Sequence, residues 1–305
     1  MPATEYLLKR SNINSSVDSE GRVVLRGVKY FSIEKTFDCG QCFRFDKTDK
    51  GEYDERVRGV AHGKLVEFAR KGDEYYIIGS TLDEYKNIWR HFLGLDVNYP
   101  KLRDRIIDEN KTHSVISPAE ECSNGIRILS QDPFETLISF IISQNNNIPR
   151  IKGIIERLCR KAGERFIGFD GNEYYSFPTA ERILKEGADM LKEIGTGFRA
   201  KYIIDACERV SARRIDFDYI KDCEDTAECT RHLCEIYGVG VKVASCVLLF
   251  AFEKFDAYPE DVWIKKVHAK YFKEDFDSAS LGKYRGLVQQ WLFFYERYNG
   301  GETDG

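Results

Sequence analysis

The hydrophobic pattern changes near residue 115, and this change constrains the fold more than any other feature of the chain. Before it, short β-rich runs are separated by glycine and charged turns, as in an antiparallel sheet: RVVLRGVKYFSI, FDCGQCFRF, RVRGVAHGKLVEFAR and DEYYIIG. After it, apolar residues recur at helical spacing. We therefore expect an α+β protein, with an antiparallel β-rich domain over residues 1–115 and a mostly α-helical domain over residues 116–305.

Two helices carry explicit start signals. Thr81 and Glu84 form a capping-box pattern. The helix behind them would lay one apolar stripe on the sheet: Tyr85, Ile88, Trp89 and Phe92. Asp132 and Pro133 fit the N-cap and first position of a second helix, with Glu135 at the third. Further helices are expected over 148–163, 179–187, 199–214, 226–238, the run after Val241, 261–272 and 282–298.

Composition narrows the class of protein. Hydrophobic residues make up 42% of the chain and charged residues 31%, which is typical of a soluble globular protein. No apolar run reaches membrane-spanning length, and the N-terminus lacks a signal-peptide pattern. Nine scattered cysteines indicate reduced thiols in a cytosolic compartment. The net charge of −4 counts against a general nucleic-acid coat protein, but it leaves room for a local phosphate-binding patch.

Lys242 stands at an unfavourable place for a cation. It lies at the start of an almost wholly apolar helix, where the helix dipole disfavours a positive charge by about 0.3–1 kcal/mol. Burial among apolar neighbours can depress a lysine pKa by up to roughly 3–5 units, so desolvation would dominate. Both effects favour the neutral amine, which is a nucleophile. The alternative is a lysine whose stem packs while its head reaches solvent.

A carboxylate can return to this lysine. A helix of about 11 residues is roughly 16 Å long, and the segment 254–260 can span up to roughly 23 Å. Asp261 can therefore lie beside Lys242, and it also fits the N-cap of the next helix. Glu260 is the rival carboxylate. Gly238 and Gly240 would permit a turn with positive φ, whose free N–H groups at the next helix form a phosphate site.

Hairpin, lysine and returning aspartate together resemble the helix-hairpin-helix DNA glycosylases with a Gly/Pro-rich-loop aspartate, and among them the 8-oxoguanine DNA glycosylases. The resemblance runs over nearly the whole chain. It is strongest in five blocks: FDCGQCFRF, GIRILSQDPFETLISFIISQNNNIPRIKGIIERLC, GTGFRAKYI, YGVGVKVASCVLLFAF and VQQWLFF. It implies an N-terminal domain resembling half a TATA-binding protein, followed by two helical subdomains with the catalytic cleft between them.

The resemblance implies a base-excision repair enzyme that flips 8-oxoguanine opposite cytosine out of duplex DNA, cuts its glycosidic bond and nicks the strand by β-elimination. Lys242 resembles the Schiff-base nucleophile, and Asp261 the carboxylate that stabilises positive charge at the sugar. Cys246 and Phe293 would be the walls of the base pocket, and Gln289 would reach the Watson–Crick edge. The Gly40 carbonyl would accept from N7–H, which 8-oxoguanine has and guanine lacks. Plain core packing is the alternative for both pocket walls.

Further residues resemble those that manage the opened duplex. Asn145 would fill the vacated space, Arg150 and Arg199 would read the orphaned cytosine, and Phe198 would wedge between bases. The implied partner is duplex DNA containing 8-oxoguanine. The protein would act as a monomer and would not bind a membrane. It would work in the cytoplasm, associated with the nucleoid, or in a nucleus. No cofactor is required, but a monovalent cation would be held by three backbone carbonyls of the hairpin, those of Cys234, Ile236 and Val239.

One position departs from the family: residue 263 is Trp, where well-known members have a phosphate-contacting His. An iron–sulfur cluster is not expected, because no Cys follows Cys246. Three other interpretations exist. The two cysteines of CGQC, at 39–42, could be a thioredoxin-type redox pair. Four residues could be zinc ligands: Cys223, Cys229, His232 and Cys234. The fold could also belong to a non-catalytic or differently specific DNA-binding protein.

Overall fold

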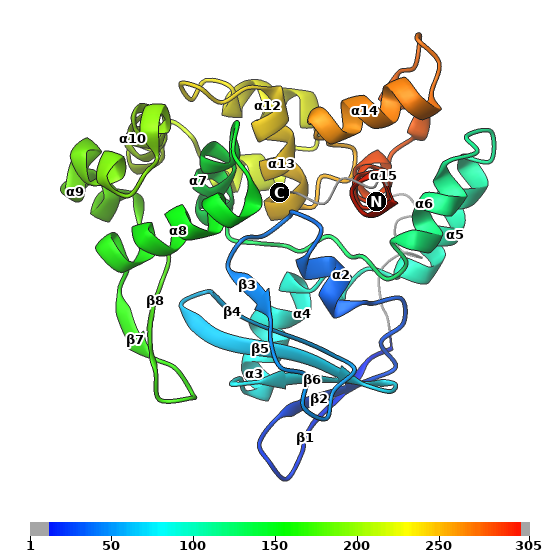
Figure 1. Ribbon diagram of the computed structural model, residues 1–305, viewed down its shortest axis with the longest axis horizontal. Coiled ribbons are helices and arrows are strands. Elements are labelled where there is room, and N and C mark those ends of the chain that lie inside the picture. Colours follow the sequence, from blue (N-terminus) through cyan, green and yellow to red (C-terminus); the bar gives the residue numbers. More distant parts are fainter. Residues whose placement is uncertain (1–11, 300–305) are drawn as a thin grey trace.

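The computed structural model describes residues 12–299, and its N-terminal part is a six-stranded antiparallel sheet (Figure 1). The strand order is β1-β2-β6-β5-β4-β3. The strands are β1 (Asn14–Val17), β2 (Val23–Arg26), β3 (Phe45–Lys47), β4 (Glu55–Ala61), β5 (Lys64–Lys71) and β6 (Glu74–Ile78). Strands β4 and β5 form a hairpin whose two central residues, His62 and Gly63, have φ of 51° and 70°. Positive φ at both positions suits a turn that follows the twist of the strands.

One face of the sheet is covered by the helix that the capping box predicts. Thr81 and Glu84 make both reciprocal bonds at the start of α3 (Leu82–Glu84). The chain then passes through a wide π-helical turn, η1 (Tyr85–Trp89), into α4 (Arg90–Phe92), so a regular α-helix was wrong for the middle of this segment. The apolar stripe is confirmed: Trp89 is fully buried, and its ring lies 5.7 Å from that of Phe68 on β5.

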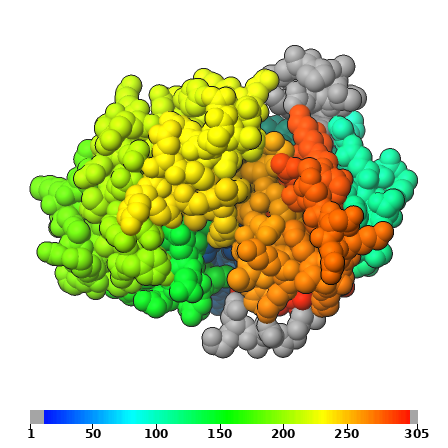
Figure 2. All heavy atoms as spheres, turned by 90° about the horizontal axis from the view of Figure 1, so that it is seen from above, coloured from blue at the N-terminus to red at the C-terminus, as the bar shows by residue number. Residues whose placement is uncertain are grey.

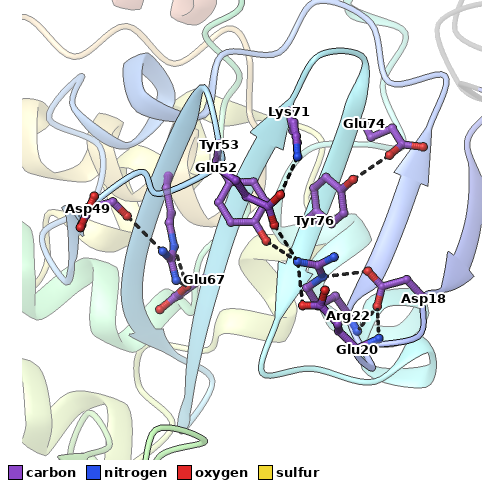
Figure 3. Close-up of polar contacts among 11 residues, drawn as sticks. Asp18, Glu20, Arg22, Asp49, Glu52, Tyr53, Glu67, Lys71, Glu74 and Tyr76 are labelled. Atoms are coloured by element: carbon purple, nitrogen blue, oxygen red, sulfur yellow. Dashed lines mark hydrogen bonds and ion pairs between the residues drawn. The ribbon is translucent and has the colours of Figure 1, made fainter.

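The opposite face of the sheet carries a network of charges and tyrosines (Figure 3). Arg22 Nε lies 2.7 Å from Asp18, and its Nη1 donates to the Tyr53 hydroxyl at 2.8 Å. Glu67 is fully buried and accepts from Arg56 Nε at 2.8 Å. The partly exposed Arg22 pairs contribute only about 0–1 kcal/mol each, whereas the arginines beside Glu67 neutralise a buried charge that would otherwise be costly. The other face is thereby left to pack against the helices.

Residues 37–45 do not form the expected strand. Helix α2 (Ile33–Phe37) occupies the start of the stretch, 38–44 is irregular, and only Phe45–Lys47 is a strand. The reason lies in the buried Gln41 side chain. Its Nε2 donates to the carbonyls of Thr36 and Arg127 at 2.9 and 2.8 Å, and its Oε1 accepts from Leu129 N at 2.8 Å. One side chain thus satisfies backbone groups that a strand neighbour would otherwise pair.

The rest of the described chain is mainly helical, as expected (Figure 1). The α-helices are α5 (Tyr99–Glu109), α6 (Ile116–Cys122), α7 (Pro133–Ser143), α8 (Ile148–Ala162), α9 (Ala180–Glu193), α10 (Ala200–Ser211), α11 (Phe217–Asp222), α12 (Thr226–Leu233), α13 (Val241–Phe252), α14 (Val262–Tyr271) and α15 (Arg285–Asn299). Two 3₁₀ turns, η2 (Gly197–Arg199) and η3 (Ser278–Leu281), complete the set. Within 12–299, no helix is long and apolar enough to span a bilayer. The expected division of the chain at residue 115 stays a prediction.

A small hairpin that the sequence pattern did not reveal joins the helical part to the sheet. Its strands are β7 (Arg165–Ile167) and β8 (Glu173–Tyr175), and Figure 1 shows it reaching down beside the sheet. At its tip Asp170 pairs with Arg58 of β4 at 2.9 Å. The Phe169 ring lies so close to Gly79 that a Cβ there would be 2.1 Å from it. The two parts of the chain are therefore fastened together away from the cavity described next.

Candidate active site

A cavity of about 570 Å³ lies where the two parts of the chain meet. Its walls come from the end of α7 and the loop after it, α13, α15, the segment 259–265 and the loop after α2. Seen from above, the surface is hollowed between the green and orange segments, and the blue N-terminal part is visible inside the hollow (Figure 2). The cavity brings together most of the predicted site residues: Gly40, Asn145, Gly240, Lys242, Cys246, Asp261, Gln289 and Phe293.

Lys242 is the second residue of α13, and its side chain is half-buried at the cavity wall. Its Nζ lies 5.3 Å from the centroid of the Phe140 ring, within cation–π range. Gly240, the N-cap of this helix, provides no side-chain capping bond. The helix therefore opens onto the cavity with free backbone N–H groups beside the amine.

Asp261 does return to the lysine. It caps α14, with its Oδ1 accepting from Ile264 N at 2.9 Å, as the sequence predicted. Burial raises the pKa of the Asp261 carboxyl, and the Ile264 amide and the nearby Lys242 ammonium oppose that rise. The carboxylate thus lies in a poorly solvated place within electrostatic reach of Lys242. The rival Glu260 also lines the cavity, but its side chain is 46% exposed and lies 3.8 Å from His268 Nδ1.

The predicted base pocket is assembled around Phe293. Cys246 is buried one helical turn beyond Lys242; burial raises the pKa of its thiol to about 11, and the Lys242 ammonium opposes the rise. Gly40 has a φ of +75°, and a Cβ there would lie 3.4 Å from the Phe293 ring. The Gly40 backbone therefore lies directly against one pocket wall. Gln131 steadies the same loop, since its Nε2 donates to the Gln41 carbonyl at 2.7 Å.

Gln289 is buried at the cavity wall, and its hydrogen-bond partner is a residue outside the predicted site. The next residue, Gln290, donates from its Nε2 to Gln289 Oε1 at 2.7 Å. Each glutamine is only 3% exposed, and both line the cavity. The signal was present as two adjacent amides within an apolar helix, but only Gln289 matched the family motif.

The loop after α7 is held by Arg199. Its guanidinium is buried and donates to the backbone carbonyls of Gln144, Asn145 and Thr196. Asn145 itself is exposed and has a φ of 48°, a left-handed value that asparagine adopts more readily than most residues other than glycine. In this structure Arg199 thus fixes the segment that presents Asn145, and its role at the orphaned cytosine stays a prediction.

Arg150 and Phe198 lie beside Arg199 and point outward. Arg150 is exposed in the first turn of α8. Burial is the main cause that lowers the pKa of Arg199, and the charge of Arg150 lowers it further. Phe198 is 52% exposed, with the Arg199 guanidinium 4.4 Å from its ring centroid. An exposed aromatic ring and an exposed cation thus both lie near Arg199. Their predicted roles as wedge and cytosine reader are compatible with that placement.

The helical hairpin is formed by α12 and α13, and only one of its two glycines has the positive φ that we expected. Gly238 has a φ of +80°, and a Cβ there would lie 2.4 Å from the ring of Tyr202. Gly240 has a φ of −103°, so the prediction of positive φ at this position was wrong. A Cβ on Gly240 would meet no atom within 4 Å. This glycine therefore matters by leaving open space in front of the α13 N-terminus.

The structure does not favour the two alternative chemistries, a thioredoxin-type cysteine pair and a zinc site. Cys39 follows the C-terminal end of α2, whereas a reactive pair needs a helix N-terminus, and burial raises the pKa of Cys39 to about 12. Burial raises the pKa of Cys42 further. Among residues 12–299, no three His, Cys, Asp or Glu side chains are grouped to hold a metal ion, so the zinc set around His232 is not assembled. At the departing position, Trp263 lines the cavity, with Lys266 Nζ 4.6 Å from its ring centroid.

Comparisons with known proteins agree with this architecture. Residues 138–279 match the HhH-GPD superfamily of base excision DNA repair proteins, and residues 23–137 match the N-terminal domain of 8-oxoguanine DNA glycosylase. A hairpin followed by a cavity-lining lysine and aspartate defines the class, a helix-hairpin-helix DNA repair protein. The chain belongs to the 8-oxoguanine DNA glycosylase family within that superfamily.

Individual relatives support the same assignment. The N-glycosylase/DNA lyase of Saccharomyces cerevisiae is 34% identical over 240 residues, which is 75% of this chain and 61% of the yeast protein. The Arabidopsis thaliana N-glycosylase/DNA lyase is 28% identical over 285 residues, 86% of this chain and 76% of the plant protein. The Clostridium acetobutylicum 8-oxoguanine glycosylase/lyase, solved with double-stranded DNA containing cytosine opposite 8-oxoguanine, superimposes with a TM-score of 0.85 at 34% identity. That match covers 96% of this chain and all of the Clostridium chain.

Proposed function

We propose that this protein is a base-excision repair enzyme that removes 8-oxoguanine opposite cytosine from duplex DNA and then nicks the strand. The observation that carries the proposal is the meeting of Lys242 and Asp261 in one cavity with the predicted base-pocket residues. The Clostridium relative is described as a glycosylase/lyase bound to such DNA, and it matches this chain along its whole length. A binding protein without catalysis would not need this amine and this carboxylate together.

The reaction follows from what the two groups can do. The Lys242 amine attacks the anomeric carbon of the flipped nucleotide, the bond to the base breaks, and an imine links the sugar to the protein. Asp261, as a carboxylate, stabilises the positive charge that develops on the sugar and helps to remove protons. Loss of a proton from the sugar carbon next to the imine then expels the 3′ phosphate by β-elimination.

Base choice would depend on the pocket around Gly40. Its carbonyl accepts the N7–H of 8-oxoguanine, whereas guanine would present a lone pair there. Such a buried mismatch costs about 1–3 kcal/mol, a factor of roughly 5–150, which is too little against the excess of guanine. Flipping the base costs a few kcal/mol more and adds an earlier selection step. Asn145 and Arg150 would manage the vacated duplex on the other side.

The hairpin would hold the DNA backbone. Open space at Gly240 lets a phosphate approach the free N–H groups of α13. The carbonyls of Cys234, Ile236 and Val239 would hold a monovalent cation; that of Ile236 also accepts from Val239 N at 3.0 Å. A bound cation would add positive charge beside that phosphate. We further propose that the protein acts as a monomer, away from membranes, in the cytoplasm with its nucleoid or in a nucleus.

Borohydride reduction tests the proposal. A labelled 8-oxoguanine·cytosine duplex should become covalently attached to the wild-type protein, and Lys242→Gln should abolish the adduct. Lys265→Gln is the matched control, since Lys265 is the other lysine that lines the cavity, and this variant should keep the adduct. Equal trapping by Lys242→Gln and wild type would show that another amine does the chemistry. Thermal unfolding of each variant separates loss of chemistry from loss of fold.

A further inference from the structure

The Gln290 side chain lines the cavity, and its amide oxygen lacks a hydrogen-bond donor within residues 12–299. Its Nε2 donates to Gln289 Oε1 at 2.7 Å, while its Oε1 has no hydrogen-bond partner among the described residues. The residue is 97% buried yet contributes to the cavity wall. A buried carbonyl oxygen without a donor is costly, so native proteins rarely keep one without a reason. An acceptor of this kind is suited to a ligand that brings an N–H group.

Its place on α15 directs it to the same site as Gln289. Gln290 lies one helical turn before Phe293 and two before Arg297, and all of these residues line the cavity. The bond between the two amides also fixes the orientation of Gln289. With its oxygen facing the Gln290 donor, Gln289 retains one free lone pair and two N–H groups.

Gln289 alone cannot satisfy every hydrogen-bonding group on the Watson–Crick edge of the proposed base. The Watson–Crick edge of an oxidised guanine offers the O6 acceptor, the N1–H donor and the exocyclic amine donor. Gln289 alone can meet O6 with its Nε2 and N1–H with its remaining lone pair. The exocyclic amine then requires a second acceptor. The Gln290 side chain contributes to the same wall, and its Oε1 is a buried acceptor without a hydrogen-bond partner among the described residues.

We infer that Gln290 is a second specificity-determining residue: it orients Gln289 and accepts a hydrogen bond from the exocyclic amine of the flipped base. This inference rests on the proposed function, because it takes the ligand to be a guanine derivative. It predicts that the enzyme reads the 2-amino group as well as the N7 position. A purine lesion that lacks this amine should therefore be bound less well.

The test compares 8-oxoguanine with 8-oxohypoxanthine, which differs only by lacking the exocyclic amine. Binding is measured in the Lys242→Gln protein, so that readout of the base does not depend on catalysis. Loss of the amine should weaken binding about 5- to 150-fold when Gln290 is present. In the Lys242→Gln, Gln290→Met double variant, the two duplexes should bind within about twofold of each other. Gln290→Glu keeps an acceptor but loses the donor to Gln289 Oε1, so it should recover only part of the preference for the aminated base.

The outcomes are distinct. Equal discrimination by the Gln290→Met and Gln290 proteins would overturn the inference, as would equal binding of both duplexes by the Lys242→Gln protein. Absence of a borohydride adduct in the wild-type protein would instead count against the proposed catalysis. Far-ultraviolet circular dichroism and thermal unfolding check that Gln290→Met is folded. If Gln290 had only a structural role, Gln290→Met would weaken the binding of both duplexes by the same factor.

Discussion

Asp261→Asn separates the two roles that the structure gives to one carboxylate. Oδ1 caps α14 through the Ile264 amide at 2.9 Å, and the same carboxylate lies within electrostatic reach of Lys242. Asparagine caps a helix as well as aspartate does, whereas alanine gives up about 0.5–2 kcal/mol, typically about 1. We expect Asp261→Ala to lower the unfolding temperature by about 2–4 °C for a chain of this size, and Asp261→Asn not to lower it.

The stability of Asp261→Asn should also depend on pH. Burial raises the pKa of Asp261 in the folded protein above its ordinary value of 3.8, so the folded state holds the proton to higher pH than the unfolded state. Ionisation therefore destabilises the fold as pH rises through the folded pKa. Asparagine never ionises. Its advantage over wild type should be present at pH 7 and should shrink as the pH is lowered toward that ordinary value, measured by denaturant unfolding.

Excision should fail in both variants even though only one loses the cap. Removing a catalytic carboxylate of this kind typically costs about 10²–10⁴ in rate. Single-turnover release of 8-oxoguanine measures the loss directly. A fully active Asp261→Asn protein would refute a catalytic role for the charge. Equal destabilisation by Asn and Ala would refute the capping argument.

Three further changes probe other parts of the structure. Glu135→Gln should gain stability relative to wild type as the pH rises from 5 to 8, because burial raises the pKa of Glu135 to about 7, although the change also removes the carboxylate that lies 3.6 Å from Arg44; denaturant unfolding at both pH values checks this, and the opposite trend would contradict it. Gly238→Ala should destabilise the protein by about 1–3 kcal/mol and weaken DNA binding, since its Cβ would meet the Tyr202 ring at a φ of +80°; an unchanged melting temperature would be the contrary result. Arg150→Ala should narrow the preference for cytosine over adenine opposite the lesion, measured as a ratio of excision rates; equal ratios in variant and wild type would remove Arg150 from that role.

Features with a local cause were the most predictable. The caps at Thr81, Asp132 and Asp261 each depend on a side chain and an amide three residues away, and all three are present. The fold class followed from the change of hydrophobic period and is confirmed by the sheet and the helices after it. The return of Asp261 to Lys242 needed only the length of one helix and one connection.

Features with distant causes were not predictable. The irregular stretch 38–44 depends on bonds from Gln41 to Arg127 and Leu129, more than eighty residues away along the chain. The β7–β8 hairpin has strands of three residues each, too short for a recognisable alternation. Arg199 matched a motif for reading DNA, but its burial against backbone carbonyls depends on how η2 packs on the preceding loop.

The anchoring of Gln41 has a consequence for selectivity. Four hydrogen bonds, to Thr36, Arg127, Leu129 and Gln131, hold the turn that carries Gly40. In the proposed role of Gly40, a carbonyl held this firmly would not move away from the lone pair of an undamaged base. The repulsion would then act on the nucleotide and favour its return to the base stack. Loosening that support should therefore make the enzyme more permissive rather than simply weaker.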